Sequence, residues 1–574
     1  MNLFDDKSPD TYDAIVVGTG ISGGWAAKEL CEKGLKTLVL DRGRNVKHVV
    51  DYHTANMDPW DFELGGRLPK AIIEKDYPKQ NRTGYTTKEE HVHFFVKDSE
   101  HPYGEAKGKR FDWIRGYQVG GRSLVWGRQS YRWSEMDFEA NAKEGIAVDW
   151  PIRYADIAPW YDRVERYIGV SGRKEGLTQL PDGEFQLPMD LNCVEQHLRD
   201  QIAQKFDDRI LTIGRTAHIT DPNGLNGRGS CKFRDRCMRG CPYGAYFSSQ
   251  ASTLPAADAT GNMTLRPNSI AYEVVYDENK KRATGVRIID TETKKTYFFK
   301  SKIIFLNASA IASTQILMMS KSNRFPNGMG NDSGELGHNI MDHHFHVGAN
   351  ADVEGFEDKF FKGRRPNGIY IPRFRNLPGR PETKKDFLRG YGYQGGASRE
   401  NWMRGVAELG FGGAYKDELF KPGSWRMGLL AFGEILPDHA NKMELNESKK
   451  DNWGLPTLTF DTEMKENELK MREDMESAAV EILEKAGFKN VQGYNSDNYG
   501  VGLGIHEMGT ARMGRDPKTS VLNGWNQVHD VPNVFNTDGA CMTSSACQNP
   551  SLTYMALTAR AANYAVEQLK KGNL

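Results

Sequence analysis

The stretch DAIVVGTGISGG at residues 13–24 decides the fold expected for this chain. It begins as a short run of apolar, β-branched residues and ends in glycines. A helical stretch, AAKELCEKG (26–34), follows it, and then a second apolar run, KTLVLD (36–41). The expected order is therefore strand, glycine turn, helix, strand, which is typical of an α/β domain with a parallel sheet.

Three glycines of this stretch form a pattern that binds phosphates. Gly18, Gly20 and Gly23 make G-x-G-x-x-G between the strand and the helix, and Asp41 ends the next strand. Glycine permits the tight turn and lets backbone amides approach a pyrophosphate at the positive end of the helix, while Asp41 can accept hydrogen bonds from adenosine ribose hydroxyls. Strand, helix and acid in register predict a dinucleotide site, and at this point FAD and NAD both remain open.

The composition excludes several other classes of protein. Lys plus Arg and Asp plus Glu number 76 each, so no excess of positive charge is available for nucleic acid or anionic lipid. The chain has no apolar run approaching the ~18 residues that span a bilayer, so we expect no membrane span. The first residues, MNLFDDKSPDTYD, lack the apolar core of a secretory signal, and we expect no export address in the chain itself.

Other segments outline the remaining architecture. Residues 549–571 predict a long helix, with Asn549 suited to the N-cap, Pro550 at the first helical position and basic residues in the last turn. Residues 263–309 look like strands and hairpins, and residues 319–504 form a mixed region. The histidines of 338–346 raise the question of a metal, but we expect this segment to be a structural turn leading into a sheet.

Further motifs carry a resemblance to a known family. A second glycine-rich stretch, Gly120-Gly121-Arg122-Ser123, is followed by SAIASTQIL (309–317), GHNIMDH (337–343) and HEMGTARMG from His506. With the N-terminal fingerprint and in this order, they resemble the glucose-methanol-choline (GMC) family of flavin oxidoreductases over nearly the whole chain. The resemblance implies FAD, with Gly120, Gly121 and Ser123 lying along the cofactor. It also implies non-covalent FAD, since Val125 stands where some sugar oxidases of the family carry a flavin-linked His.

The same resemblance assigns the chemistry. His506 looks like the family's catalytic base, and Asn549, in N-P-S-L-T, looks like its partner that holds the substrate oxygen. A neutral imidazole beside the flavin suits removal of a hydroxyl proton while hydride leaves the carbon. Asp538, in N-T-D-G-A, resembles the position whose neighbouring amides contact the FAD pyrophosphate and ribityl chain. An N-cap role alone is the structural alternative for Asn549.

A cysteine cluster departs from a plain member of that family. Cys231, Cys237 and Cys241 lie within eleven residues, and Pro242 follows the last of them. Closely spaced thiolates on a loop can bind one iron-sulfur cluster, and C-x3-C-P is similar to the end of bacterial ferredoxin motifs. The spacing lacks the C-x2-C pairs of structural zinc, although zinc and unliganded thiols remain alternatives. Similar spacing occurs in bacterial FAD-dependent glucose dehydrogenase catalytic subunits, which implies [3Fe-4S]; a [4Fe-4S] cluster would need a further ligand such as Cys193.

A cluster would carry electrons singly to an external acceptor, so we expect a dehydrogenase that passes them to a partner such as a cytochrome c and makes little peroxide. The chain looks most like glucoside 3-dehydrogenase catalytic subunits, which implies oxidation at C3 of a pyranose or glycoside to a 3-keto sugar. The alternatives are oxidation at C1 to a lactone, oxidation of a sugar acid or polyol, an NAD-dependent dehydrogenase, and a non-catalytic flavin electron-transfer protein.

The resemblance also implies a small accessory subunit, and it implies that the protein acts in the periplasm after co-export with a partner. Otherwise we expect the protein to be in the cytoplasm. Substrate-binding groups are expected in GASRENWMRG (396–405), GFGGAY (410–415) and PGSWRMGLLAFGE (422–434). The expected fold is α/β, with a Rossmann-like FAD-binding domain interleaved with an α+β substrate domain on an antiparallel sheet. The expected ranges are 1–155, 210–318 and 505–574 for the FAD domain, with a cluster loop at 225–247, and 156–209 and 319–504 for the substrate domain.

Overall fold

A computed structural model describes residues 1–5, 8–360, 363, 365–400, 412–496 and 499–574. Its first sheet has eight strands, with β16-β17-β8-β1-β2-β5 as the main order and the β6–β7 hairpin joined to β8. The strands β1, β2, β5, β8 and β17 pair in parallel. The bounds are β1 Thr11–Val17, β2 Thr37–Leu40, β5 Met263–Arg266, β6 Ser269–Asp277, β7 Arg282–Asp290, β8 Thr296–Leu306, β16 Gln527–Val528 and β17 Val531–Asn536.

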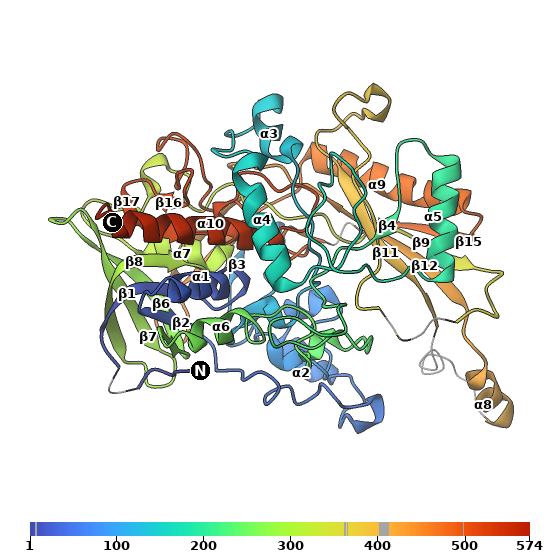
Figure 1. Ribbon diagram of the computed structural model, residues 1–574, viewed down its shortest axis with the longest axis horizontal. Helices are drawn as coiled ribbons and strands as arrows, with labels where there is room; N and C mark the ends of the chain where they lie inside the picture. The colour runs from blue at the N-terminus through green and yellow to red at the C-terminus, as the bar shows by residue number, and fades with distance from the viewer. Residues whose placement is uncertain (6–7, 361–362, 364, 401–411, 497–498) are drawn as a thin grey trace.

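Helices cover this sheet because its central strands are apolar on both faces. All four residues of β2 are buried, as are the last four of β1. Helix α1 (Ile21–Glu32) packs against α10 (Ser551–Lys570) and α6 (Thr253–Ala259), and α10 packs in turn against α4 (Tyr154–Ile168). Figure 1 shows α10 and α4 crossing on this side of the molecule, with α7 (Ala310–Met319) close to the sheet. The α/β expectation is confirmed.

The second sheet has six strands in the order β15-β9-β12-β11-β10-β4, and its pairs are antiparallel. Helix α9 (Glu466–Lys485) packs on β9, β12 and β15, and α5 (Cys193–Lys205) packs on α9 and β11. These elements lie on the right of Figure 1, with α8 (Gly412–Phe420) beyond them. The strand bounds are β4 Thr212–Ile213, β9 Val347–Val353, β10 Ile369–Ile371, β11 Tyr391–Arg399, β12 Trp425–Gly433 and β15 Lys489–Asn495.

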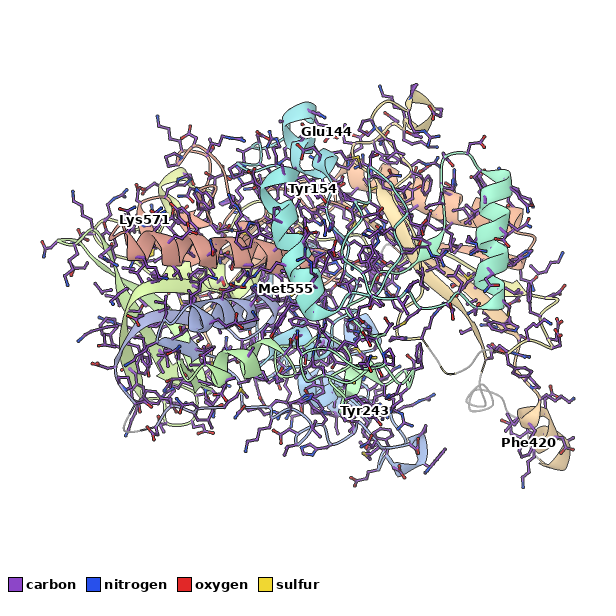
Figure 2. All side chains as sticks on the ribbon, in the orientation of Figure 1. Glu144, Tyr154, Tyr243, Phe420, Met555 and Lys571 are labelled. Atoms are coloured by element: carbon purple, nitrogen blue, oxygen red, sulfur yellow. The ribbon has the colours of Figure 1, made fainter. Side chains whose placement is uncertain are left out.

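A small third sheet, β13-β14-β3, joins distant parts of the chain. Its strands are β3 Gly104–Glu105, β13 Lys442–Lys450 and β14 Pro456–Asp461, and two further helices are α2 Lys70–Asp76 and α3 Glu135–Glu144. Side chains fill the space between these elements and the two larger sheets, as Figure 2 shows. Among the described helices, none is long and apolar enough to cross a membrane.

The expected domain boundaries stay a prediction, but two elements lie across them. β4 belongs to the antiparallel sheet although its residues fall within 210–318, because it pairs with β10. Most of α4 falls within 156–209, yet its buried Ile157, Tyr161 and Val164 share a core with the strands of the parallel sheet. The final helix begins at Ser551 with Pro550 as its N-cap, one residue later than the expected Asn549 N-cap and Pro550 start.

Candidate active site

The nucleotide fingerprint folds as the glycine spacing predicts. Gly18 has φ +99°, and a Cβ there would lie 2.2 Å from the Asn307 carbonyl oxygen. A Cβ on Gly23 would lie 2.0 Å from the Gly18 carbonyl oxygen, whereas Gly20 faces open space. The first and third glycines therefore let the strand and helix approach closely, and the second leaves room for a ligand at the start of α1.

The second glycine stretch meets the first. The Gly120 amide donates to the Thr19 hydroxyl at 2.7 Å, and a Cβ on Gly121 would lie 3.6 Å from the Gly20 Cα. Ser123 lies on the short turn η4 (Gly121–Leu124), where its hydroxyl donates to the Gly120 carbonyl at 2.6 Å. Two segments that are about a hundred residues apart in the chain therefore form one wall.

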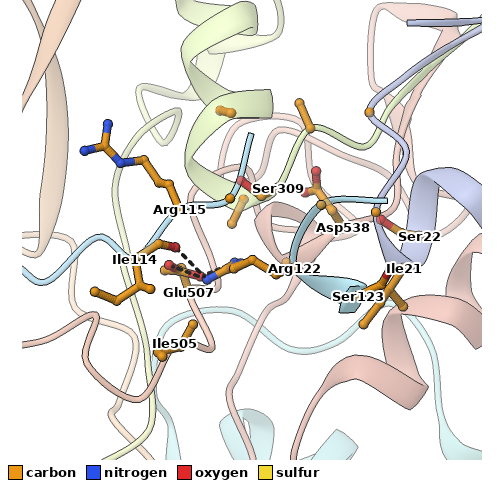
Figure 3. A pocket seen from close by; sticks show the side chains of 18 of the residues that line it. Ile21, Ser22, Ile114, Arg115, Arg122, Ser123, Ser309, Ile505, Glu507 and Asp538 are labelled. Atoms are coloured by element: carbon orange, nitrogen blue, oxygen red, sulfur yellow. Dashed lines mark hydrogen bonds and ion pairs between the residues drawn. The ribbon is translucent and has the colours of Figure 1, made fainter. Parts of the chain in front are cut away.

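That wall borders a cavity of about 410 Å³. Of the ten predicted catalytic and cofactor residues, the lining includes Gly18, Gly20, Asp41, Gly121, Ser123, His506, Asp538 and Asn549. Gly23 and Gly120 are not in the lining but shape its wall, since Gly23 packs on Gly18 and Gly120 lies against the Gln250 side chain. Figure 3 shows Ile21, Ser22, Ser123, Ser309 and Asp538 around one end of this cavity.

Two buried carboxyl groups, Asp41 and Asp538, line the cavity. Asp41 follows β2 and accepts hydrogen bonds from the Thr19 amide at 3.2 Å and the Gly43 amide at 2.9 Å. Asp538 accepts from the Ser313 hydroxyl at 2.6 Å and the Ala540 amide at 3.0 Å. Burial raises the pKa of each carboxyl to about 6.

Two buried polar atoms mark the cavity as a place for a polar ligand. The Tyr554 hydroxyl and the Asn307 Oδ1 have no hydrogen-bond partner among the described residues, and both side chains line the cavity. A buried polar group without a partner is costly. Together with the space at Gly20, these atoms fit a bound dinucleotide that would satisfy them.

An ion pair connects the wall formed by the two glycine-rich stretches, here called the cofactor wall, to the segment that carries His506. Arg122 of η4 donates to Glu507 through two nitrogens at 3.0 and 2.7 Å, and it also donates to the Ile114 carbonyl at 3.2 Å. Figure 3 shows these contacts at the end of the cavity opposite Ser22. The bidentate geometry fixes the GG-x-S turn relative to His506, because Glu507 is its direct neighbour in the chain.

His506 and Asn549 are brought together although they lie far apart in sequence. The Asn549 side-chain amide donates to His506 Nε2 at 3.3 Å, and its Oδ1 accepts from the Gln394 amide of β11 at 2.6 Å. Asn549 thus directs its side chain to the cavity, and α10 begins after Pro550 without a side-chain cap. Burial lowers the pKa of His506 well below its ordinary value, with His343 and Arg122 adding to the shift. The imidazole is therefore neutral and able to accept a proton.

One residue of this site is absent from the sequence-based predictions. His343 lies in the segment that we expected to be only a structural turn, yet its Nδ1 is 2.9 Å from His506 Nδ1. Its neighbour His344 is buried and its Nε2 contacts the Glu434 carbonyl at 3.1 Å, while His346 stacks on Tyr499. The one available signal was the N-x-M-D-H motif itself, which does not say what the histidine contacts.

The predicted substrate region contributes to the cavity in part. Gln394 and Phe432 line it from β11 and β12, and Phe345 and Gln129 line it from other segments. The ring centres of Phe432 and His506 are 6.3 Å apart. Residues 401–411, which include parts of two stretches named above, lie outside the described residues.

The three clustered cysteines lie on one loop, near enough to one another for their thiols to interact electrostatically. The pKa of the Cys231 thiol is raised to about 11, first by burial and then by the neighbouring thiols Cys237 and Cys241. The Cys237 sulfur lies 3.7 Å from His218 Nε2. Tyr243, two residues after Cys241, is exposed and is labelled in the lower part of Figure 2. Across the described part of the chain, no group of three or more His, Cys, Asp or Glu side chains is arranged to hold a metal ion. Cys231, Cys237 and Cys241 as metal ligands therefore stay a prediction.

Unpaired positive charge surrounds these thiols. The Nε and Nη1 of Arg228 and the Nε of Arg128 are buried and have no partner among the described residues. Burial lowers the pKa of Arg228 to about 10, and Cys241 counteracts the shift. Arg128 in turn acts on Cys231 and Cys237 by lowering their pKa values against the larger effect of burial. Such donors fit an anionic group held by the cysteines.

The cysteine loop also contacts the cofactor wall directly. The turn η5 (Cys237–Arg239) packs on η4, and Met238 packs against the apolar group that contains Leu124 and Val125. Tyr246, which interacts electrostatically with Cys237, donates its hydroxyl to the Leu124 carbonyl at 2.5 Å.

The other cysteines are placed elsewhere. Cys193 begins α5, and its charged neighbours are Glu195 and Lys359. Cys31, Cys541 and Cys547 are buried.

Comparison with known proteins decides the family. A family model described as GMC oxidoreductase matches residues 211–345, and a second with the same description matches residues 437–558. The chain is a GMC oxidoreductase. Among the relatives of this GMC oxidoreductase, 2-methyl-1,2-propanediol dehydrogenase of Mycolicibacterium austroafricanum is 27% identical over 97% of the chain and 95% of that protein. Fructose dehydrogenase large subunit of Gluconobacter japonicus is 26% identical, over 98% of both chains.

Solved structures support the same fold. Formate oxidase of Aspergillus oryzae RIB40 covers the whole of both chains with a TM-score of 0.61 at 12% identity. As a GMC oxidoreductase, the protein is an FAD-dependent enzyme that acts on CH–OH groups, and the expectations of family, fold and enzyme class are confirmed.

Proposed function

We propose that this GMC oxidoreductase is a sugar dehydrogenase that oxidises a secondary hydroxyl, at C3 of a pyranose or glycoside, to a ketone. The observation that carries the proposal is the pairing of His506 Nε2 with the Asn549 amide on a cavity wall that also holds neutral amides and aromatic rings. Two polar groups directed at one point suit a hydroxyl, and aromatic faces suit the apolar faces of a sugar ring.

The chain's own residues account for the proton. The substrate O–H donates to His506 Nε2, the O–H bond breaks, and the neutral imidazole becomes imidazolium. The Asn549 amide, which donates to Nε2 in the free protein, can turn to the substrate oxygen and hold it as charge develops there. The Gln394 amide keeps Asn549 in this orientation by donating to its Oδ1. FAD, when bound, supplies the acceptor for the hydride that leaves the carbon.

Residues of the cofactor wall would hold FAD. Gly18, Gly20 and Gly23 admit its pyrophosphate to the start of α1, and Asp41 stands at the end of β2 for its ribose. Gly120, Gly121 and Ser123 form the opposite wall, and Asp538 lies beside them in the lining. Val125 also lines the cavity and cannot form a link to flavin, so we propose dissociable FAD.

The choice of a neutral polyhydroxyl substrate rests on the charge of the lining near His506. The charged pair Arg122 and Glu507 is satisfied internally by its two hydrogen bonds, and the Gln394 amide, which is bonded to Asn549, is a neutral polar group on the lining beside His506. The names of the relatives, a diol dehydrogenase and a fructose dehydrogenase, support polyols and sugars as the substrate class.

The position oxidised is separated by one experiment. We expect methyl α-D-glucopyranoside to be converted to its 3-keto product, identified by NMR, because the methyl group blocks C1 and leaves C3 available. If glucose reacts and the methyl glycoside does not, oxidation at C1 replaces oxidation at C3. If only polyols or sugar acids react, they replace glycosides as the substrate.

We further propose an iron-sulfur cluster on Cys231, Cys237 and Cys241, of the [3Fe-4S] type. A cluster carries its own bridging sulfides, so its protein ligands stand farther apart than around a single ion, and the electrostatic coupling of the three thiols supports one group among them. The orphan N–H groups of Arg228 and Arg128 would face its negative charge. When bound, the cluster supplies a one-electron carrier next to the GG-x-S turn.

A cluster at that position favours an external acceptor over oxygen. We propose a cytochrome c-type acceptor and a small accessory subunit, and the name "large subunit" of the fructose dehydrogenase relative supports a multisubunit assembly. We also propose that the enzyme acts in the periplasm and is exported together with such a partner. Rapid reduction of an artificial acceptor with little peroxide is expected, and stoichiometric peroxide would contradict it.

A further inference from the structure

We propose that His343 is a positioning residue that holds the His506 ring in the one tautomer able to accept the substrate proton. The inference rests on the proposed role of His506 as base and extends it to a residue that does not touch the reacting atoms. It starts from a chain of hydrogen bonds. His343 Nε2 lies 2.7 Å from the Ala546 carbonyl oxygen, and His343 Nδ1 lies 2.9 Å from His506 Nδ1.

The Ala546 carbonyl at the end of this series of hydrogen bonds determines which nitrogen carries each hydrogen. A carbonyl oxygen only accepts, so His343 Nε2 must carry the hydrogen. His343 is buried, and burial lowers its pKa to about 4, so the ring is neutral near pH 7 and Nδ1 bears a lone pair. The hydrogen between the two rings must therefore sit on His506 Nδ1. His506 is neutral as well, which leaves its Nε2 with a lone pair.

That lone pair points to the place where the chemistry needs it. The group next to His506 Nε2 is the Asn549 amide at 3.3 Å, which donates and therefore agrees with an unprotonated Nε2. In the opposite tautomer, an N–H at His506 Nε2 would face the N–H of the Asn549 amide. His343 Nδ1 and His506 Nδ1 would then face each other with no hydrogen between them. The Gln394 amide also agrees, since by donating to Asn549 Oδ1 it turns the Asn549 nitrogen towards His506.

The position of His506 in the chain is held by a different residue. Asp342 accepts from the backbone amides of Gly502 and Gly504 at 2.8 Å each and of His506 at 2.9 Å. The backbone is thus anchored by Asp342, and the ring tautomer is determined by His343. This separation makes the role of His343 testable without moving His506.

The arrangement differs from a base supported by a carboxylate. His343 is a neutral acceptor, so it orients the His506 ring and stabilises the imidazolium only through a neutral hydrogen bond. When His506 Nε2 takes the substrate proton, Nδ1–H stays bonded to His343 and no second proton moves. Loss of the acceptor should therefore affect the rate of oxidation more than the binding of substrate.

The test compares three variants of the holoenzyme by anaerobic stopped-flow bleaching of the flavin. The probes are methyl α-D-glucopyranoside and, so that the result does not depend on C3 oxidation, 1,2-propanediol. H343L removes the acceptor, and H343N returns one, because the Asn Oδ1 can occupy the place of His343 Nδ1. H344L is the matched control: His344 is the next residue, equally buried, with one ring contact to a backbone carbonyl, and it does not line the cavity.

We expect H343L to lower the limiting rate of flavin reduction by roughly 10–100-fold, below the ~10⁴-fold effect of a wrong tautomer supported by a carboxylate. The substrate concentration for half the limiting rate should stay within about threefold, since the site still binds the hydroxyl. H343N should recover most of the rate, and H344L should retain it.

The inference is overturned if FAD-bound H343L reduces its flavin at the wild-type rate, or if H343N is no faster than H343L. H343M serves as a second variant without a nitrogen acceptor should H343L fail to retain FAD. Failure of the proposed base is a distinct outcome, because it would appear as rapid reduction in H506A.

Discussion

Removal of His506 tests its proposed role as the general base. Two carboxyl groups lie close to this histidine, and both are engaged: Asp342 accepts three backbone amides, and Glu507 accepts two hydrogen bonds from Arg122. A general base contributes about 10²–10⁴-fold; both carboxyl groups are engaged and His343 contacts the Nδ1 side of the ring, away from Nε2, so we expect H506A to lose roughly 10³–10⁴-fold. This corresponds to ~4–5 kcal/mol of barrier, at 1.36 kcal/mol for each factor of ten.

The assay is anaerobic reduction of the bound flavin by methyl α-D-glucopyranoside, followed at the flavin absorption maximum. H506A should bind FAD as the wild type does, since no predicted pyrophosphate or ribose contact involves His506. H506N is a second variant with a polar side chain that is not basic, and it should be equally slow. A bleaching rate within tenfold of the wild type in FAD-bound H506A would refute the role of base.

Further outcomes follow from neighbouring charges. Burial, aided by Glu507, raises the pKa of Asp342 to about 7, so the stability contributed by its protonated form is lost as pH rises from about 4 to 7. The free energy of unfolding of flavin-free D342N, relative to wild type, should therefore increase between pH 5 and pH 7, by up to ~1.4 kcal/mol per pH unit, as denaturant unfolding at each pH would measure. E507Q leaves Arg122 without its anion and should destabilise by about 2–3 kcal/mol, with recovery on adding R122M, as a double-mutant thermal unfolding series would measure. R228M removes a cation beside the proposed cluster and should lower its midpoint potential by about 30–60 mV in a redox titration, whereas the same change at exposed Arg426 should leave it unchanged.

The nucleotide-binding half could be predicted from sequence because its signals are local. Gly18, Gly20 and Gly23 each meet a steric or spatial condition that the spacing already implies, and β1 and β2 are the apolar runs that flank them. The helix at the C-terminus was also evident from composition. Its start was misplaced by one residue, because the Asn549 side chain bonds to Gln394 and His506 instead of capping the helix, and no local pattern contains these contacts.

The remainder depends on contacts between distant segments. His343 reaches His506 over 163 positions of the chain, and Arg122 reaches Glu507 over 385. No local sequence pattern in β4 indicates that this strand pairs with β10. Likewise, Arg128 comes from a segment far from Cys231, Cys237 and Cys241, and although Arg228 is close to them in sequence, only the fold shows that its Nε and Nη1 are buried without a partner.

The most direct measurement is a pair of spectra, visible and electron paramagnetic resonance, of the purified holoprotein before and after anaerobic addition of methyl α-D-glucopyranoside. We expect flavin absorption that bleaches with the glycoside, together with an oxidised three-iron signal that is lost on reduction and is absent in C237S. A protein whose flavin does not respond to any sugar, or one that contains no iron after anaerobic purification, would contradict the sugar oxidation or the cluster respectively.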